Sequence, residues 1–282
     1  MGVLAIVFDE RAKSASAAQA LRALHAAGSV TLFGMVIVVR EVGGRGLSVQ
    51  EPMAKGASAA APAVGAVAGA LVSLLGGPAA AAARTLDASL MGTVHDLLEV
   101  GLAAGFIEQL SRHLRPGCAA ILADVEEESP LPLEACIAPL GGRTLRQVQD
   151  AIAPEELMVR EAVALRREVA ALRQEPKDAD HAAASEALRR ARAAELRHAL
   201  RRARILASAL RREAAAKVVV LREQAASLEG ETRAAIEHRA GLVRKRLALR
   251  ASQLDRLIED LVWPAMRSPA SGRRGRKWNR NF

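Results

Sequence analysis

Residues 56–83 read GASAAAPAVGAVAGALVSLLGGPAAAAA and carry no charged side chain. Small residues recur here at every fourth position, which places them on one face of a helix. Such a face lets a second helix backbone approach closely, the packing called a glycine zipper. We expect a helical hairpin over residues 57–90, broken at residues 76–78 (GGP). Its packing face consists of Ala61, Gly65, Gly69, Ser73 and Gly77.

The segments around this hairpin have the pattern of a small α+β domain. Three apolar runs predict buried strands at Val3–Phe8, Phe33–Arg40 and Cys118–Val125. Leu47–Gln50 predicts a short strand after a glycine-rich turn. Helical spacing predicts helices over 14–27 and 97–114, and shorter elements follow at 133–137 and 142–145. The order β-α-β-β-(helical hairpin)-α-β over residues 1–153 predicts a ferredoxin-like domain.

Three segments of this domain also carry a family resemblance. They are ALRALHAAGSVTLFGMVIVVREVGGRG at 20–46, GAVAGALVSLLGGP at 65–78 and GLAAGFIEQLSRHLRPGCAAILADVEE at 101–127. Over about residues 1–160 the chain resembles the bacterial and archaeal family called domain of unknown function 1269. The resemblance implies the same α+β fold and the membrane-like character that the glycine-rich segment gives that family. It implies no activity, because the family has none established.

Residues 154–263 predict a helical arm. Met158, Ala162, Leu165, Val169 and Leu172 follow 4-3-4-3 spacing, which predicts a short coiled-coil helix over 154–175. Beyond it, 181–263 contains no proline and predicts one long Arg-rich helix. An apolar stripe from Leu210 to Leu261 follows that helix. A lone helix cannot bury such a stripe, so we expect it to pack on a second protomer, on the 154–175 helix or on the domain.

The charge of the chain is concentrated in this second half. The net charge is +9, but residues 1–154 hold 11 basic and 14 acidic side chains, against 29 and 17 in 155–282. This asymmetry indicates an anionic partner: nucleic acid, a membrane surface or an acidic protein. Nine arginines cluster between 189 and 212; they could neutralise phosphates, but we interpret them as a solvated coiled-coil face whose charge nearby glutamates partly offset. The segment 264–282 predicts a disordered basic tail, whose expected contacts are Arg273, Arg274, Arg276, Lys277, Trp278 and Arg280.

The sequence shows no arrangement of residues that would carry catalysis. The two cysteines have no metal-ligand spacing, and the glycine-rich turn at 43–46 lacks a phosphate-binding pattern. Glu126, Glu127 and Glu128 form an acidic triplet, which we interpret as a solvated turn in preference to a cation site. We therefore expect no enzyme activity, cofactor, metal or small-molecule substrate.

These patterns favour a non-enzymatic, homo-oligomeric protein that is membrane-associated or a scaffold, self-associating through the zipper and the coiled coil. The alternative is a nucleic-acid-binding architectural protein that acts through the arm and tail. Residues 1–10 (MGVLAIVFDE) lack a signal-peptide pattern, so we expect a cytoplasmic location, with the inner membrane as one site of association.

Overall fold

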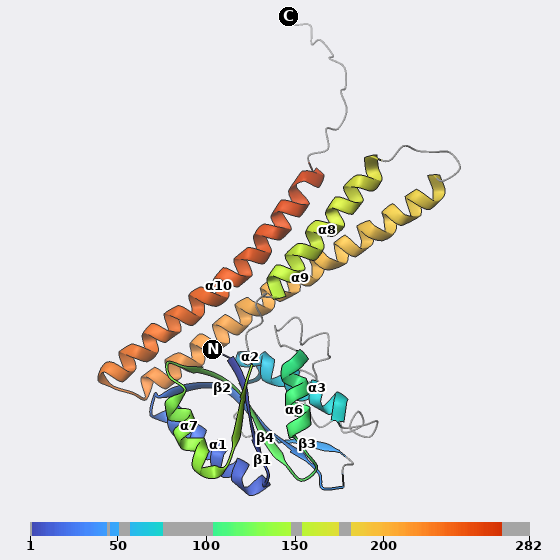
Figure 1. Ribbon diagram of the computed structural model, residues 1–282. Coiled ribbons are helices and arrows are strands. Elements are labelled where there is room, and N and C mark those ends of the chain that lie inside the picture. The colour runs from blue at the N-terminus through green and yellow to red at the C-terminus, as the bar shows by residue number, and fades with distance from the viewer. Residues whose placement is uncertain are drawn as a thin grey trace, which may run out of the picture.

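One antiparallel sheet organises the fold. The computed structural model describes residues 2–43, 46–50, 57–75, 104–147, 154–174 and 182–266. Its strands are β1 (Gly2–Phe8), β2 (Val30–Arg40), β3 (Leu47–Gln50), β4 (Ala119–Glu127) and β5 (Arg143–Arg146). They lie in the order β3-β2-β4-β1-β5, and every neighbouring pair is antiparallel (Figure 1). The predicted α+β class is therefore confirmed.

The strand predictions are close to the observed bounds, and two features refine them. Leu47–Gln50 occupies an edge of the sheet, whereas β4 lies centrally between β1 and β2. The pairing of β2 with β4 shifts between Leu32 and Gly34, which makes Phe33 the extra residue of a β-bulge. Bulges redirect a side chain locally, and Phe33 is fully buried on the face that receives the helical arm.

Two helices cover the other face of the sheet. They are α1 (Arg11–Ala26) and α7 (Leu131–Ile137), which contact each other (Figure 1). The alternate residues of each strand separate the two faces, because successive side chains of a strand point to opposite sides. Leu4, Ile6 and Phe8 of β1 belong to the core beneath α1 and α7, while Val3, Ala5 and Val7 belong to the opposite core.

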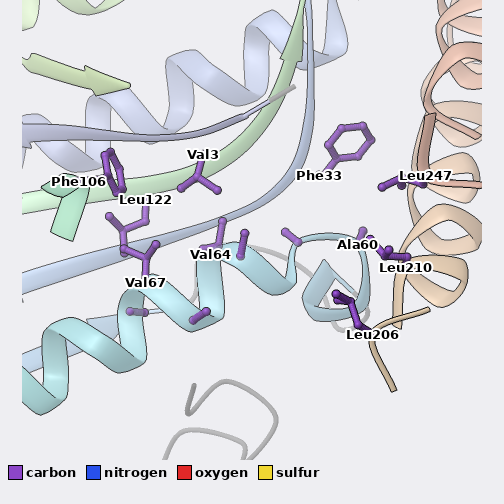
Figure 2. Close-up of a cluster of buried hydrophobic side chains, with 14 of the residues drawn as sticks. Val3, Phe33, Ala60, Val64, Val67, Phe106, Leu122, Leu206, Leu210 and Leu247 are labelled. Carbon is purple, nitrogen blue, oxygen red and sulfur yellow. The ribbon is translucent and has the colours of Figure 1, made fainter. Parts of the chain in front are cut away.

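The opposite face is covered by the charge-free helix and by the arm. Here lie α2 (Ala57–Ala60), α3 (Pro62–Leu75) and α6 (Ala104–His113). Val64 and Val67 of α3 pack beside Leu122 of β4 and Phe106 of α6 (Figure 2). The first helix of the predicted hairpin is thus present, and its predicted second helix lies outside the described residues.

The arm consists of α8 (Pro154–Gln174), α9 (Ala182–Ala226) and α10 (Gly230–Met266). The prediction of one helix over 181–263 is wrong, because the chain turns at 227–229 and α10 returns along α9 (Figure 1). Gly230 adopts φ +58° at this turn, a backbone conformation that glycine reaches without steric cost. A glycine at the end of a long apolar period is a helix-stop signal.

The turn explains how the apolar stripe is buried. Leu210 and Leu221 of α9 and Val243, Leu247 and Leu254 of α10 are buried in one core that continues onto the sheet. The short helix α8 contacts both α9 and α10. Of the three expected partners for the stripe, α8 and the domain are present within the chain. The expected boundary near residue 153 therefore separates segments of sequence but not separate cores.

Candidate functional site

One segment of α9, outward from the contact of this helix with the sheet, contains arginines but no acidic residue. Residues 196–212 (LRHALRRARILASALRR) contain six arginines and no aspartate or glutamate. The remaining Arg-rich turns, around 186–195, include Glu186 and Glu195. Because the side chains of a helix recur every 3.6 residues, the arginines of 196–212 divide between positions that face the other arm helices and positions that face outward.

Arginines at positions that face the other arm helices form ion pairs within the arm. Arg202 pairs with Glu161 of α8 at 2.7 Å, and Arg211 pairs with Asp255 of α10. The arginines before residue 196 are also paired. Arg189 and Arg190 pair with Glu186, and Arg192 pairs with Glu168 and Glu195. The arm therefore neutralises a large part of the predicted arginine cluster itself.

Four arginines are different. Arg197, Arg201, Arg204 and Arg212 are all exposed, and none of them forms an ion pair with another described residue. Arg197 donates a hydrogen bond to the Ala193 carbonyl of its own helix at 3.2 Å. We call these four side chains the arginine face. They span about 22 Å along the helix, at 1.5 Å per residue, and no carboxylate in the described part of the chain pairs with any of them.

The inner half of α9 treats charge in the opposite way. The ammonium of Lys217 is buried against the sheet, 2.8 Å from Asp124 Oδ2 of β4 and 2.8 Å from Glu213 Oε1 one turn earlier on α9. It also lies 4.6 Å from the centre of the Phe33 ring, a cation–π distance. Lys217 and Asp124 are 1% and 2% exposed. Removal from water is costly for both charges, so each depends on the other.

Burial and pairing shift both titrations. Burial raises the pKa of Asp124 to about 6, although the positive charge of Lys217 opposes that rise. Burial by itself lowers the pKa of Lys217, but the attraction of Asp124 and Glu213 outweighs it and leaves the pKa of Lys217 raised. Lys217 therefore stays charged at neutral pH, and Asp124 titrates in the mildly acidic range.

A second polar group lies where the arm turns against the sheet. The amide nitrogen of Gln224 donates to the carbonyls of His25 at 2.6 Å and Val30 at 2.9 Å, while its oxygen accepts from the Thr31 hydroxyl at 2.7 Å. Arg239 of α10 donates to the same hydroxyl at 3.0 Å. The amide of Gln224 thus bonds the last turn of α1 and the start of β2 through both of its polar atoms.

The acidic triplet belongs to this junction as well. Glu126 accepts from Arg246 at 2.9 Å, Glu128 from Arg239 at 3.1 Å, and Glu127 pairs with Arg146 of β5. The predicted solvated turn is therefore only partly correct: the side chain of Glu128 is exposed, but all three carboxylates have arginine partners. Among the described residues no group of three His, Cys, Asp or Glu side chains is arranged to hold a metal ion.

The predicted packing face of the charge-free segment is described in part. Ala61, Gly65 and Gly69 are buried on or next to α3, at the four-residue spacing on which the zipper prediction rests. The side chain of Ser73 and all of Gly77 lie outside what the structure describes, so the zipper itself stays a prediction. No helix in the described ranges is long and apolar enough to cross a membrane.

The predicted contacts of the tail, Arg273 to Arg280, lie outside the described residues, since α10 ends at Met266. Sequence reasoning missed Lys217 and Asp124, although both left a signal. Lys217 lies between Ala214 and Leu221 at 3-4 spacing, in the apolar track, and Asp124 interrupts the buried run ILADV. A charged residue at a core position of each of two elements predicts that those elements meet.

Comparison of this chain with protein-family models, with curated proteins and with solved structures gives no match. The resemblance to domain of unknown function 1269 therefore stays a prediction. What the chain does has to be argued from the arm and from its junction with the sheet.

Proposed function

We propose that this chain is a non-enzymatic scaffold protein that binds nucleic acid through the outer face of its helical arm. The observation that carries the proposal is the arginine face: four exposed arginines without a carboxylate partner among the described residues, on a segment of α9 (196–212) that has no acidic residue of its own. Guanidinium groups bind phosphate oxygens in a fixed planar geometry. A row of them on a rigid helix supplies affinity for a phosphate backbone without reading base sequence.

Packing within the arm favours this proposal over self-association through the apolar stripe. The stripe is buried against α8, the other arm helix and the sheet, so the arm needs no second copy to cover it. The arginines on the inner positions are neutralised by carboxylates of the same chain, whereas those of the arginine face are left for a partner. Membrane association and homo-oligomer formation through the charge-free segment remain predictions, which liposome flotation and sedimentation would test.

The test is a charge-neutralised variant with a matched control. The variant carries Arg197→Gln, Arg201→Gln, Arg204→Gln and Arg212→Gln. The control removes the same four charges from other exposed arm positions, with Arg222→Gln, Arg244→Gln, Lys245→Gln and Arg256→Gln. Binding of a labelled 30-base-pair DNA duplex is measured by fluorescence anisotropy from 50 to 300 mM salt.

We expect the wild-type affinity to fall steeply as the salt concentration rises, because bound counterions are released from DNA. The variant should bind at least tenfold more weakly at low salt, and its slope of log K against log salt should lose up to about 3.6, or about 0.9 for each phosphate contact. An equal loss in the control would show that only net charge matters. Salt-independent binding in the wild type would contradict the proposal outright.

The basic tail is tested in the same experiment. A chain lacking residues 268–282 is compared with the full chain in both the wild-type and the variant background. If the tail and the arginine face bind one duplex together, removal of the tail should weaken binding in both backgrounds. Full loss on tail removal, with no effect of the arm variant, would place the binding in the tail alone.

We also infer a ferredoxin-like core for the sheet. With the edge strand β3 set aside, the strands lie in the order β2-β4-β1-β5, and α1 and α7 each connect two strands over the same face. That arrangement supports a split β-α-β topology in which α2, α3 and α6 are inserted between β2 and β4. The sequence predicted this topology with Leu47–Gln50 as an inner strand, whereas the inference assigns that position to β4.

A further inference from the structure

The apolar contact between α9 and its surroundings is repetitive. Its buried positions are occupied by alanine and leucine at 3-4 spacing, at Ala203, Leu206, Leu210, Ala214 and Leu221. If α9 slid by one turn so that each site received the residue four positions later, the five sites would be filled by Ala207, Leu210, Ala214, Val218 and Ala225, which are again apolar. Burial of apolar area is non-directional, so this contact specifies poorly where along its length the arm rests on the sheet.

Asp124 distinguishes the observed axial position of α9 from the displaced ones. The residues that a slide would bring toward Asp124 in place of Lys217 are those three, four or seven positions away on α9. They are Ala214, Val220, Glu213, Leu221, Leu210 and Gln224. None of them is basic, and Glu213 would bring a second carboxylate next to that of Asp124. Only the observed placement gives the buried carboxylate a cation, since Lys217 is the one basic residue between Arg212 and Arg222.

We propose that the buried Lys217–Asp124 pair fixes the axial position of the arm on the sheet. Lys217 is then a positioning residue, and its partner across the interface, 93 positions earlier in the chain, is the reference point. The pair thereby sets how far the arginine face stands from the sheet. This inference goes beyond nucleic-acid binding and does not depend on it, because it concerns where the arm rests and not what the arm binds.

The Lys217–Asp124 pair can fix the axial position of the arm without adding to the stability of the fold. A buried ion pair gains its Coulomb energy only by offsetting the cost of taking two charges out of water, so apolar side chains of similar size can replace both at little cost. A buried carboxylate without its cation is costly instead. The pair therefore disfavours every displaced arrangement without having to stabilise the observed one. The arm turn approaches the sheet domain closely at Gly28, where an added Cβ would lie 2.5 Å from Thr232 Cγ2.

The experiment measures one distance across the junction by pulsed electron spin resonance. Spin labels are attached at Val42→Cys and Ile205→Cys, which are 83% and 61% exposed, in a full-length chain carrying Cys118→Ala and Cys136→Ala. The wild-type pair should give a single narrow distance. The double variant Asp124→Leu with Lys217→Met is made in a Glu213→Gln background, so that no carboxylate is left without Lys217. It should keep its thermal midpoint within a few degrees but show a broadened or split distance distribution.

A relocation variant keeps the proposal falsifiable if the double variant fails to fold. Lys217→Leu combined with Leu221→Lys moves the cation one turn along α9, in the direction that withdraws the arm turn from Gly28. The main distance should then shift by up to about 6 Å, four residues at 1.5 Å each. An unchanged single distance in either variant would overturn the proposal, since apolar packing and the other polar contacts of the junction, those of Gln224 above all, would then position the arm.

A matched control comes from the same junction. Arg246→Met with Glu126→Leu removes an ion pair in which the side chain of Arg246 is 39% exposed. The Glu126 side chain is 14% exposed, so this pair is less completely removed from water than Lys217 and Asp124, and the distance distribution should stay narrow. If this control broadened the distribution as much as the Asp124 and Lys217 variant does, positioning would belong to the junction charges in general and the specific assignment to Lys217 would fail.

Discussion

The two halves of α9 carry positive charge in opposite circumstances. In the outer half, Arg197, Arg201, Arg204 and Arg212 are exposed and have no acidic partner among the described residues. In the inner half, Lys217 is fully buried and is held by two carboxylates and an aromatic ring. The two proposals assign these charges different roles, the exposed arginines in binding a partner and the buried lysine in placing the helix. Burial and pairing, more than the number of charges, decide what each charge contributes.

The strongest way to break this contrast is to remove the buried cation. Lys217→Met leaves Asp124 and Glu213 without their counter-charge and should lower the free energy of unfolding by about 3–5 kcal/mol at pH 7.5. Urea unfolding followed by circular dichroism measures the change. Arg212→Met, five residues away on the outer half, is the control and should stay within about 0.5 kcal/mol of the wild type. Equal effects at both sites would show that the two halves do not differ.

Proton binding at Asp124 gives the next largest effect. Its pKa is about 6 in the folded chain, above the ordinary value of 3.8, so the folded state binds the extra proton between these values. The contribution of Asp124 to the free energy of unfolding is therefore full below about pH 4 and is lost as the pH rises through 6. The change is about 3 kcal/mol at 1.36 kcal/mol per unit.

Asp124→Asn should remove this pH dependence, and the difference between the wild-type and variant profiles isolates the group from all others that titrate. The profiles are measured by urea unfolding at intervals from pH 4 to pH 8. If the difference were flat across that range, or rose with pH, the titration of Asp124 would not be coupled to folding in the stated sense.

A smaller effect is expected where the arm turn meets the sheet domain. Gly28→Ala places a methyl group 2.5 Å from Thr232 Cγ2 and 3.0 Å from Leu228 Cδ1, at a residue with φ +78°. Overpacking and backbone strain together should cost about 2 kcal/mol. Thermal unfolding measures the loss. Adding Thr232→Ser removes the nearest methyl group and should recover part of it, whereas no recovery would leave backbone strain as the whole cause.

Much of this fold could be predicted because short sequence patterns mark its strands and helices. The runs that form β1, β2 and β4 are continuous and apolar. Pro62 begins α3, and Gly117 lies in the turn before β4, as expected. The turn at 227–229 is hard to predict, because only one glycine and no proline marks it within a long apolar period. Gly230 was the available signal, and a helix of more than 80 residues without caps should itself have been suspect.

The candidate site was less predictable, since its chemistry depends on contacts between distant segments. Nine arginines between 189 and 212 look alike in the sequence, but Arg202 has Glu161 beside it and Arg204 does not. Asp124 and Lys217 are each readable as misplaced charges, yet no local rule pairs them across 93 positions. The pattern of charge was visible, and the partner of each charge required the fold.

The smallest predicted effect compares an unpaired arginine of α9 with a paired one nearby on the same helix. Arg204→Gln removes an exposed arginine without a carboxylate partner and should reduce the salt slope of DNA binding by about 0.9. Arg202→Gln removes an arginine whose side chain is 22% exposed and paired with Glu161, and it should leave the slope nearly unchanged. Anisotropy titrations at four salt concentrations distinguish the two. Equal slopes would mean that the ion pair opens when DNA binds.

The separation of Asp124 from Lys217 along the chain also has a consequence during synthesis. At about 5–20 residues per second, the ribosome needs roughly 5–20 s to add the 93 residues between them. Through that interval the sheet face that will receive the arm has no arm to cover it, and Asp124 lies within that face as an ionised, hydrated carboxylate. A charge at the centre of an uncovered apolar surface discourages association between nascent chains. The residue that later positions the arm thus first protects the surface on which the arm will rest.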